Sequence, residues 1–224
     1  MLHTSLNTGR LLAVSDIHGH AGGLQQLLDT AEYNPASDRL ILVGDYIDDD
    51  PPSWETLHLI RKLTEEGALA VPGNMELRLS AHFMDRATGA SGSLELREWL
   101  QGLPPYIEAD GYLFVHAGFR PDVPLAGQTL QDMTEIREAF WGAQPPVYAG
   151  KGIVFGHTPT FKMGAKAGEV WRKPGLTGID TGAKHSCRLT LLDVHNAVAY
   201  SCSTEATRQH YTDFRIDELA DTVS

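Results

Sequence analysis

Short apolar runs alternate with helix-like patterns along the first third of the chain. The apolar runs predict buried strands at 10–15 (RLLAVS), 39–43 (RLILV) and 68–71. Each run is followed by apolar residues at helical spacing, over 24–31, 54–66 and 75–86. Such an alternation predicts parallel strands joined by right-handed crossovers, so the opening of the chain indicates an α/β fold.

The middle of the chain has a less regular pattern. Strand-like runs at 112–116 and 152–155 lie among stretches rich in Gly, Pro and Ser. We interpret the segments 87–105 and 119–150 as surface insertions on the α/β scaffold. A single helix is expected inside the second insertion, over Leu130–Phe140.

The last third alternates apolar and polar residues. From Cys187 to Ser203 the alternation runs on both sides of a turn near His195, which predicts an antiparallel hairpin. We expect this hairpin in a second sheet. The chain has 224 residues, of which 42% are hydrophobic, and this is enough for one domain with a real core. We therefore predict a single domain over residues 1–224.

Charge and cysteine content limit the possible partners and location. A formal net charge of −11 disfavours nucleic-acid binding, which depends on Lys and Arg neutralising phosphates. No apolar run approaches a membrane-spanning length, and the first residues lack the pattern of a signal peptide, so we expect no membrane association. Two cysteines, Cys187 and Cys202, are too few for a disulfide framework and predict a cytoplasmic protein.

Polar residues stand where five of the predicted strands end. In chain order they are Asp16, His18, Asp45, Asn74, His116 and His157. Ligands of open α/β sheets bind outside the carboxyl ends of the strands, so these side chains are expected to gather at one site. Each residue alone is compatible with an ordinary cap or turn, and it is their joint occurrence that favours a site.

The six side chains form a coherent set of metal ligands. Two carboxylates, three imidazoles and one amide oxygen suit borderline divalent metals such as Mn, Fe or Zn. The set contains no Cys, which argues against a structural zinc site. Six ligands are too many for one metal with an open position. Two metals that share a bridging Asp fit better, and this arrangement serves in-line displacement at phosphorus.

Six motifs resemble those of the calcineurin-like metallophosphoesterases, in the bacterial branch of PPP-type serine/threonine protein phosphatases and symmetrical diadenosine tetraphosphate hydrolases. They are SDIHG (15–19), GDYID (44–48), GNME (73–76), FVHAG (114–118), FGHTP (155–159) and IDTG (179–182). The resemblance implies a two-sheet β-sandwich flanked by helices, with metals at one edge. It also implies hydrolysis of phosphate esters by a hydroxide that bridges two metals, expected to be Mn, with Fe or Zn as alternatives.

The resemblance implies a role for each matching residue. Asp16 and His18 would bind the first metal, and Asp45 would bridge the two metals. The ligands of the second metal would be completed by Asn74, His116 and His157. Asn74 is also expected to contact the substrate. Arg137 matches a position where the family holds the phosphate, and Arg suits a bidentate grip on phosphoryl oxygens. The alternative for Arg137 is a solvated helix arginine.

The chain departs from the family pattern at two positions. Asp49 stands where the family has an Arg, and Met75 stands where the family has a His that protonates the leaving oxygen. In the family that His is oriented by the Asp at the position of Asp48, which we retain as a candidate catalytic residue. His185 is our first candidate for a replacement proton donor, with His20 and His82 (on the predicted helix after Asn74) as alternatives.

Three functions are compatible with these features. The first is a two-metal phosphoesterase of the PPP type, acting on a phosphoprotein, a nucleotide or a small phosphoester. The second is a hydrolase of dinucleoside polyphosphates or other phosphoanhydrides. The third is a weakly active or inactive metal-binding pseudo-phosphatase. General acid catalysis contributes roughly 10²–10⁴-fold, so its loss at Met75 predicts a preference for leaving groups that depart without a proton.

Overall fold

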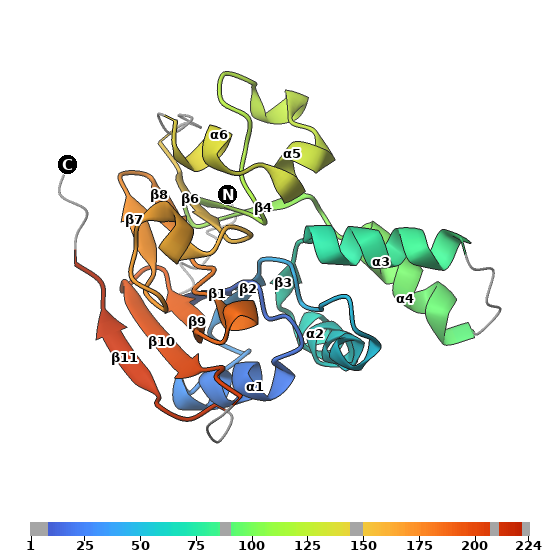
Figure 1. Ribbon diagram of the computed structural model, residues 1–224, viewed down its shortest axis with the longest axis horizontal. Coiled ribbons are helices and arrows are strands. Elements are labelled where there is room, and N and C mark those ends of the chain that lie inside the picture. Colours follow the sequence, from blue (N-terminus) through green and yellow to red (C-terminus); the bar gives the residue numbers. More distant parts are fainter. Residues whose placement is uncertain (1–8, 86–90, 144–149, 207–210, 221–224) are drawn as a thin grey trace, which may run out of the picture.

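Figure 1 shows the computed structural model of the chain, in which two sheets are flanked by helices. The structure describes residues 9–85, 91–143, 150–206 and 211–220. Parts of the predicted insertions, 87–105 and 119–150, therefore lie outside the described residues. The mixed architecture agrees with the two-sheet α/β sandwich that the motifs imply.

The first sheet has six strands in the order β11-β10-β9-β1-β2-β3. They are β1 (Leu11–Val14), β2 (Arg39–Leu42), β3 (Leu69–Ala70), β9 (Arg188–Asp193), β10 (Val198–Ser203) and β11 (Arg215–Glu218). The first three are parallel, as the strand–helix alternation predicts. β9 pairs antiparallel with β1, so the hairpin of β9 and β10 extends this sheet.

The expectation that the hairpin belongs to a second sheet is therefore wrong. All six residues of β9 are buried, as suits a central strand covered on both faces. A two-residue alternation predicts a strand, but it does not say which neighbour that strand pairs with.

The second sheet has five strands in the order β4-β5-β6-β8-β7. They are β4 (Tyr106–Ala109), β5 (Tyr112–Val115), β6 (Gly152–Phe155), β7 (Trp171–Lys173) and β8 (Leu176–Gly178). β5, β6 and β8 are parallel, and β4 and β7 are antiparallel edge strands. Sequence analysis anticipated β5 and β6 and missed β4, β7 and β8.

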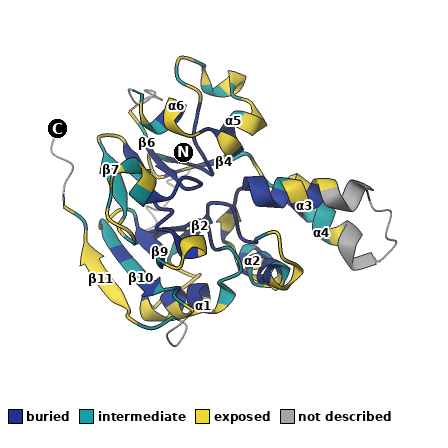
Figure 2. Ribbon diagram, viewed as in Figure 1, coloured by how far each residue is buried: buried dark blue, intermediate teal, exposed yellow. Residues whose placement is uncertain are grey.

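Alternate residues of β1 point into two different cores, because successive side chains of a strand face opposite sides of a sheet. Leu11 and Ala13 pack between the two sheets. Leu12 and Val14 pack on the other side, against helices α1 (Ala21–Thr30) and α2 (Thr56–Glu65). Figure 2 shows both strand layers largely buried, with the exposed residues on helices, loops and β11.

The remaining helices lie on the outer parts of the molecule (Figure 1). They are α3 (Asn74–Asp85), α4 (Ser91–Gly102), α5 (Leu130–Glu135) and α6 (Glu138–Trp141). The described chain also forms the 3₁₀ turns η1 (Pro51–Glu55), η2 (Leu125–Gly127), η3 (Thr160–Met163) and η4 (Ala183–His185). The prediction of a single helix over Leu130–Phe140 is wrong. The segment breaks into α5 and α6, because Ile136 is extended and Arg137 has φ −128° and ψ −119°. Burial of Ile136, Met133 and Phe140 against the second sheet compensates for the break.

Candidate functional site

The polar strand ends of the two sheets meet at one edge of the sandwich. The loops after β1 and β2 run side by side, with the amide of Asp16 donating to Gly44 O (3.0 Å) and that of His18 to Asp45 O (3.0 Å). In the second sheet the amide of Gly156 donates to His116 O (2.8 Å). A bond between the sheets closes the arrangement, since the amide of His157 donates to Asp16 Oδ2 (2.9 Å).

Asp45 lies between two groups of potential metal ligands. One group is Asp16, His18 and Asp45, and the other is Asp45, His116 and His157, with the ligand atoms of each group within 4.8 Å of one another. The two carboxylate oxygens of Asp45 face different groups: Oδ2 is 3.8 Å from His18 Nε2 and Oδ1 is 3.4 Å from His116 Nε2. Asp45 therefore has the position that a bridging ligand requires.

Backbone carbonyls orient two of the imidazoles. His18 Nδ1 donates to Ile47 O (3.1 Å) and His116 Nδ1 donates to Val43 O (2.9 Å). Both rings thus present Nε2 to the carboxylates, which is how a hydrogen-bonded His is prepared to bind a metal. Asn74 joins the second group, with its Oδ1 3.3 Å from His116 Nε2.

The His157 ring is left with an unused nitrogen. Nε2 of His157 is buried and has no hydrogen-bond partner in the structure. Burial lowers the pKa of His157 to about 3, and the adjacent His116 acts in the same direction, so the ring is neutral and its nitrogen lone pair is available. An unpaired buried nitrogen is costly, and a metal ion would satisfy it.

The centre of the site is short of positive charge. Burial raises the pKa of Asp45, an effect that His116 opposes and the charge of Asp16 reinforces. Burial also raises the pKa of Asp180 well above its usual range, and Asp16 adds to the effect. Burial acts likewise on Asp16, but the hydrogen bond from His18 and the charges of His116 and His18 together outweigh it, and the pKa falls to about 2. Crowded carboxylates of this kind are a setting that fits divalent cations.

Four of the gathered residues have strained backbones. Asp16, His18, Asp45 and His157 all have positive φ angles, between 44° and 65°, although none is a glycine. This left-handed region is uncommon for side-chain-bearing residues and typically clusters at functional sites. The strain turns each side chain sharply out of its strand and toward the others.

Cationic side chains surround this centre. They are Arg78, Arg137, Lys162 and Lys184, and they line a hollow of about 210 Å³ together with Asp16, His18, Asp45, Asn74, Met75 and the imidazole of His185. Arg137 Nη1 lies 3.2 Å from His157 O, a contact that the break between α5 and α6 permits. The site therefore combines a metal-ligand set with a basic rim, which suits an anionic substrate.

Asp48 and the candidate proton donors have definite neighbours. Asp48 Oδ1 accepts a hydrogen bond from Lys184 Nζ at 2.7 Å. The ring of His185 packs edge to face on Phe161, with centroids 5.5 Å apart. His20 contacts the Tyr211 hydroxyl (3.1 Å), and the side chain of the third candidate, His82, lies outside the described residues.

Sequence reasoning assigned no role to three groups at the site. Glu76 accepts hydrogen bonds from the amides of Asp45, Tyr46 and Gly73 at 2.8–2.9 Å. Its signal was present in the GNME motif, as that of Asp180 was in IDTG. Lys184 carried no such signal, because its contact with Asp48 joins segments that are 136 positions apart.

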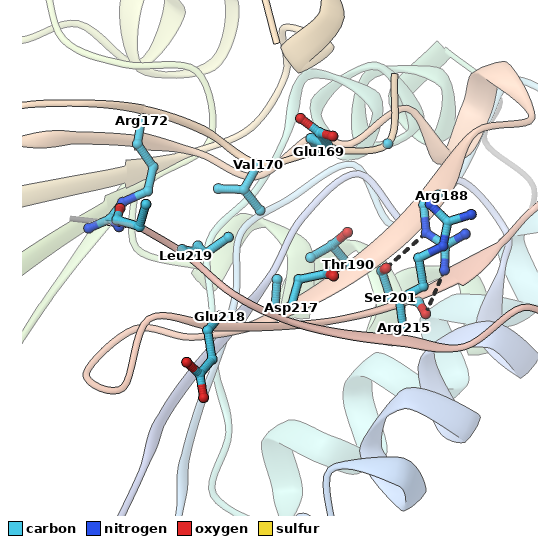
Figure 3. Close-up of a pocket in the computed structure, with 13 residues that line it drawn as sticks. Glu169, Val170, Arg172, Arg188, Thr190, Ser201, Arg215, Asp217, Glu218 and Leu219 are labelled. Atoms are coloured by element: carbon cyan, nitrogen blue, oxygen red, sulfur yellow. Dashed lines mark hydrogen bonds between the residues drawn. The ribbon is translucent and has the colours of Figure 1, made fainter. Parts of the chain in front are cut away.

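A second hollow, of about 410 Å³, lies between β10, β11 and the segment that precedes β7 (Figure 3). One of the three arginines that line it, Arg188, donates to Ser201 Oγ (2.8 Å), Ser201 O (2.9 Å) and Asp213 Oδ2 (2.9 Å). These bonds hold β10 and the start of β11 together. Among the described residues both candidate metal groups lie elsewhere, at the strand-end site.

Comparison with known proteins agrees with this geometry. The family model described as calcineurin-like phosphoesterase matches residues 9–197. Curated relatives include a symmetrical bis(5'-nucleosyl)-tetraphosphatase of Dechloromonas aromatica, 36% identical over 59% of this chain and 56% of that protein. Another, from Pseudomonas putida, is 36% identical over 57% of this chain and 48% of that protein. The chain thus spans about half the length of these relatives.

Solved structures resemble the whole described fold. A protein provisionally assigned as a diadenosine tetraphosphatase superposes with a TM-score of 0.70 at 24% identity, covering 89% of this chain and 95% of that one. A protein serine/threonine phosphatase from Saccharomyces cerevisiae gives 0.57 at 14% identity, covering 97% and 82%. At these identities the likeness concerns the fold. In the described part of the chain, no helix is both long and apolar enough to span a membrane.

Proposed function

Because this chain belongs to the calcineurin-like phosphoesterase family, we propose that it hydrolyses phosphate esters or anhydrides with the help of two divalent metal ions. The observation that carries the proposal is the position of Asp45, whose two carboxylate oxygens face two separate ligand groups. Asp16 and His18 would hold one ion. Asn74, His116 and His157 would hold the other.

The mixed nitrogen and oxygen ligands favour Mn, with Fe or Zn as alternatives. Two bound cations would activate a water nucleophile and neutralise the charge on the phosphoryl oxygens. The chain's own residues position the reactants. Arg137, next to His157, would hold a phosphoryl oxygen, and the Asn74 amide would contact the same group.

Departure of the leaving group sets the substrate preference. Met75 lines the hollow and carries no proton to donate. Burial lowers the pKa of His185, and Lys162 lowers it further, so that ring is neutral near pH 7 and a weak donor. The leaving groups of aryl phosphates and phosphoanhydrides depart as stable anions, whereas a serine alkoxide needs a proton in order to leave. We therefore infer a preference for the former over phosphoserine.

A second candidate substrate class is favoured by the basic rim. Of the chain's 18 Lys and Arg residues, four line this one hollow, on an otherwise acidic protein. A phosphomonoester dianion would be matched by the two metal ions alone. Additional cations suit a chain of linked phosphates, as in the dinucleoside tetraphosphates named for the curated relatives. Dinucleoside polyphosphates are thus our specific proposal among phosphoanhydrides.

The test compares three substrates with Mn-loaded protein: p-nitrophenyl phosphate, a phosphoserine peptide and diadenosine tetraphosphate. We expect Mn-dependent turnover, fastest on diadenosine tetraphosphate and slowest on the peptide. The control is Asp45→Asn, which should abolish turnover because it weakens both ligand groups. Equal rates on the peptide and the aryl ester would contradict the leaving-group argument.

Binding measurements separate an enzyme from an inactive scaffold. Calorimetry with Mn should detect binding to the wild-type protein and weaker binding to Asp45→Asn. Stoichiometric Mn binding with no turnover of any of the three substrates would favour the metal-binding pseudo-phosphatase. Turnover that Asp45→Asn does not reduce would overturn the proposed site.

We also propose a cytoplasmic location. Cys187 and Cys202 are both free thiols, and Cys202 is buried. Free thiols persist in reducing compartments, whereas oxidising compartments favour disulfides. Detection of the native protein outside the cytoplasmic fraction of its own cell would contradict this assignment.

A further inference from the structure

The ion pair between Lys184 and Asp48 is a tertiary contact at the edge of the candidate site. Nζ of Lys184 lies 2.7 Å from Oδ1 of Asp48, and the two residues are 136 positions apart. The lysine side chain is 40% exposed and the carboxylate 24%. The pair is thus partly accessible to solvent, and such pairs contribute little to folding stability.

Both partners are held by their own backbones. The turn that carries Lys184 is η4, whose Ala183 carbonyl accepts a hydrogen bond from Thr204 Oγ1 at 2.9 Å. On the other side, the amide of Asp48 donates to Ser53 Oγ at 2.8 Å and its carbonyl accepts from Trp54 Nε1 at 3.2 Å. Because both ends are anchored, the lysine is held in one place with little further loss of entropy.

Lys184 faces the hollow that contains the two ligand groups, and Asp48 holds it from the side. The neighbour of Asp48, Ile47, accepts the hydrogen bond that orients His18, so Lys184 lies on the His18 side of the centre. Arg137 lies on the opposite side, next to His157. The two cations thus bracket the metal-ligand set.

The local charge explains why a cation is needed at this place. Asp48 begins a run of three carboxylates, with Asp49 and Asp50 both exposed. An anionic substrate that approached along this side would be repelled by the run unless a positive group lay in front of it. Lys184 is such a group. An ammonium has three N–H donors, and the bond to Asp48 uses one of them, so two are available to a substrate.

We propose that Lys184 is a substrate-binding residue that contacts phosphate oxygens on the His18 side of the hollow, and that Asp48 is the positioning residue that holds it there. This inference rests on the proposed function, since it assumes a phosphate-bearing substrate between the two ligand groups. It gives Asp48 a role that does not depend on a histidine at position 75.

The test measures phosphate affinity as well as turnover. With Mn-loaded protein, the inhibition constant of inorganic phosphate against p-nitrophenyl phosphate should rise roughly tenfold or more in Lys184→Ala, because a charge-assisted hydrogen bond is lost. KM should rise in parallel while kcat changes less. Lys184→Arg should restore part of the affinity. Asp48→Asn should lie between wild type and Lys184→Ala, because the ammonium stays but is no longer held.

Lys166→Ala is the matched control. Lys166 also pairs with a carboxylate, Glu169 at 3.5 Å, but its side chain is 86% exposed and lies outside the hollow. It should leave the inhibition constant within twofold of wild type. Thermal unfolding of every variant checks that the fold is retained.

The inference and the proposed function fail in different ways. A phosphate inhibition constant within twofold of wild type in Lys184→Ala would overturn the inference while leaving the function intact. If the wild type shows no turnover that Asp45→Asn abolishes, the proposed function fails, and calorimetric binding of phosphate to the Mn-loaded proteins then compares wild type with Lys184→Ala directly. Equal affinity, or no phosphate binding at all, would overturn the inference in that case.

Discussion

The backbone amide of Met75 donates a hydrogen bond of 3.0 Å to Oδ1 of Asp45. The residue at position 75 therefore helps to orient the central carboxylate through its main chain, whatever its side chain. The thioether itself is buried, lines the hollow and lies 3.9 Å from Arg78 Nη1. A methionine here preserves the frame of the site and removes only the chemistry of its side chain.

Met75→His should therefore introduce a proton donor without moving Asp45. We expect the rate on a phosphoserine peptide to rise by up to about 10²-fold, the lower end of what general acid catalysis supplies. The rate on p-nitrophenyl phosphate should change less than twofold, because that leaving group needs no proton. Steady-state assays on both substrates check the ratio. Met75→Leu, which keeps an apolar side chain, should leave both rates near wild type, and an equal gain on both substrates would argue against a proton-donor effect.

Glu76→Gln should destabilise the fold more than any surface Glu→Gln change. The buried carboxylate accepts hydrogen bonds from three backbone N–H groups. In glutamine one carboxylate oxygen is replaced by an NH2 group, so two hydrogen-bond donors would face each other. The expected loss is about 2–4 kcal/mol of unfolding free energy, measured by urea denaturation. Glu66→Gln, at an exposed pair with Lys62, should cost less than about 1 kcal/mol. Similar losses in the two variants would contradict the structural role of Glu76.

Mn affinity should rise with pH between about 6.5 and 9. Burial works against protonation of His18, but the hydrogen bond and charge of Asp16 prevail and raise its pKa to about 9 in the metal-free protein. A metal ligand must be deprotonated, so binding expels this proton, and affinity should increase up to about tenfold per pH unit until the pH passes 9.

The same shift has the opposite consequence for the metal-free fold. A raised pKa in the folded state means that the stabilisation from His18 is fully present below about pH 6.5 and is lost as the pH rises through about 9. Calorimetric titrations with Mn and urea denaturation of metal-free protein, at a series of pH values, check the two trends. His18→Ala should flatten both, and an Mn affinity independent of pH in the wild type would exclude His18 as a ligand.

Gly156→Ala should disturb the first ligand group. An added Cβ would lie 2.1 Å from Asp16 Oδ2 and 1.9 Å from Ser15 Oγ, well inside contact distance. We expect a loss of stability of about 1–3 kcal/mol, as for other overpacked sites, together with weaker Mn binding. Gly102→Ala is the control, since a Cβ there meets no heavy atom within 4 Å. Comparable Mn affinity in the two variants would contradict the placement of Asp16.

Much of the site could be predicted from sequence because strand ends are local features. The apolar runs predicted β1, β2, β3, β5 and β6, and the six polar residues that follow them lie together in the structure. Parallel strands in one sheet place their carboxyl ends at one edge, so a linear pattern implies a three-dimensional cluster. The apolar run at 10–15 likewise predicted a buried strand, and β1 is buried on both of its faces.

Other features depended on contacts that no local period encodes. The break at Arg137 follows from burial of Ile136 and Phe140 against the second sheet, which overrides the helical pattern. The placement of the β9–β10 hairpin beside β1 depends on pairing between distant segments.

The sequence by itself determined the strand ends, the types of candidate ligand that follow them and the methionine at position 75. Only the tertiary structure decided that Asp45 faces two ligand groups and that Asp48 holds Lys184, since these relationships arise when the two sheets pack and bring loops far apart in the chain to one edge.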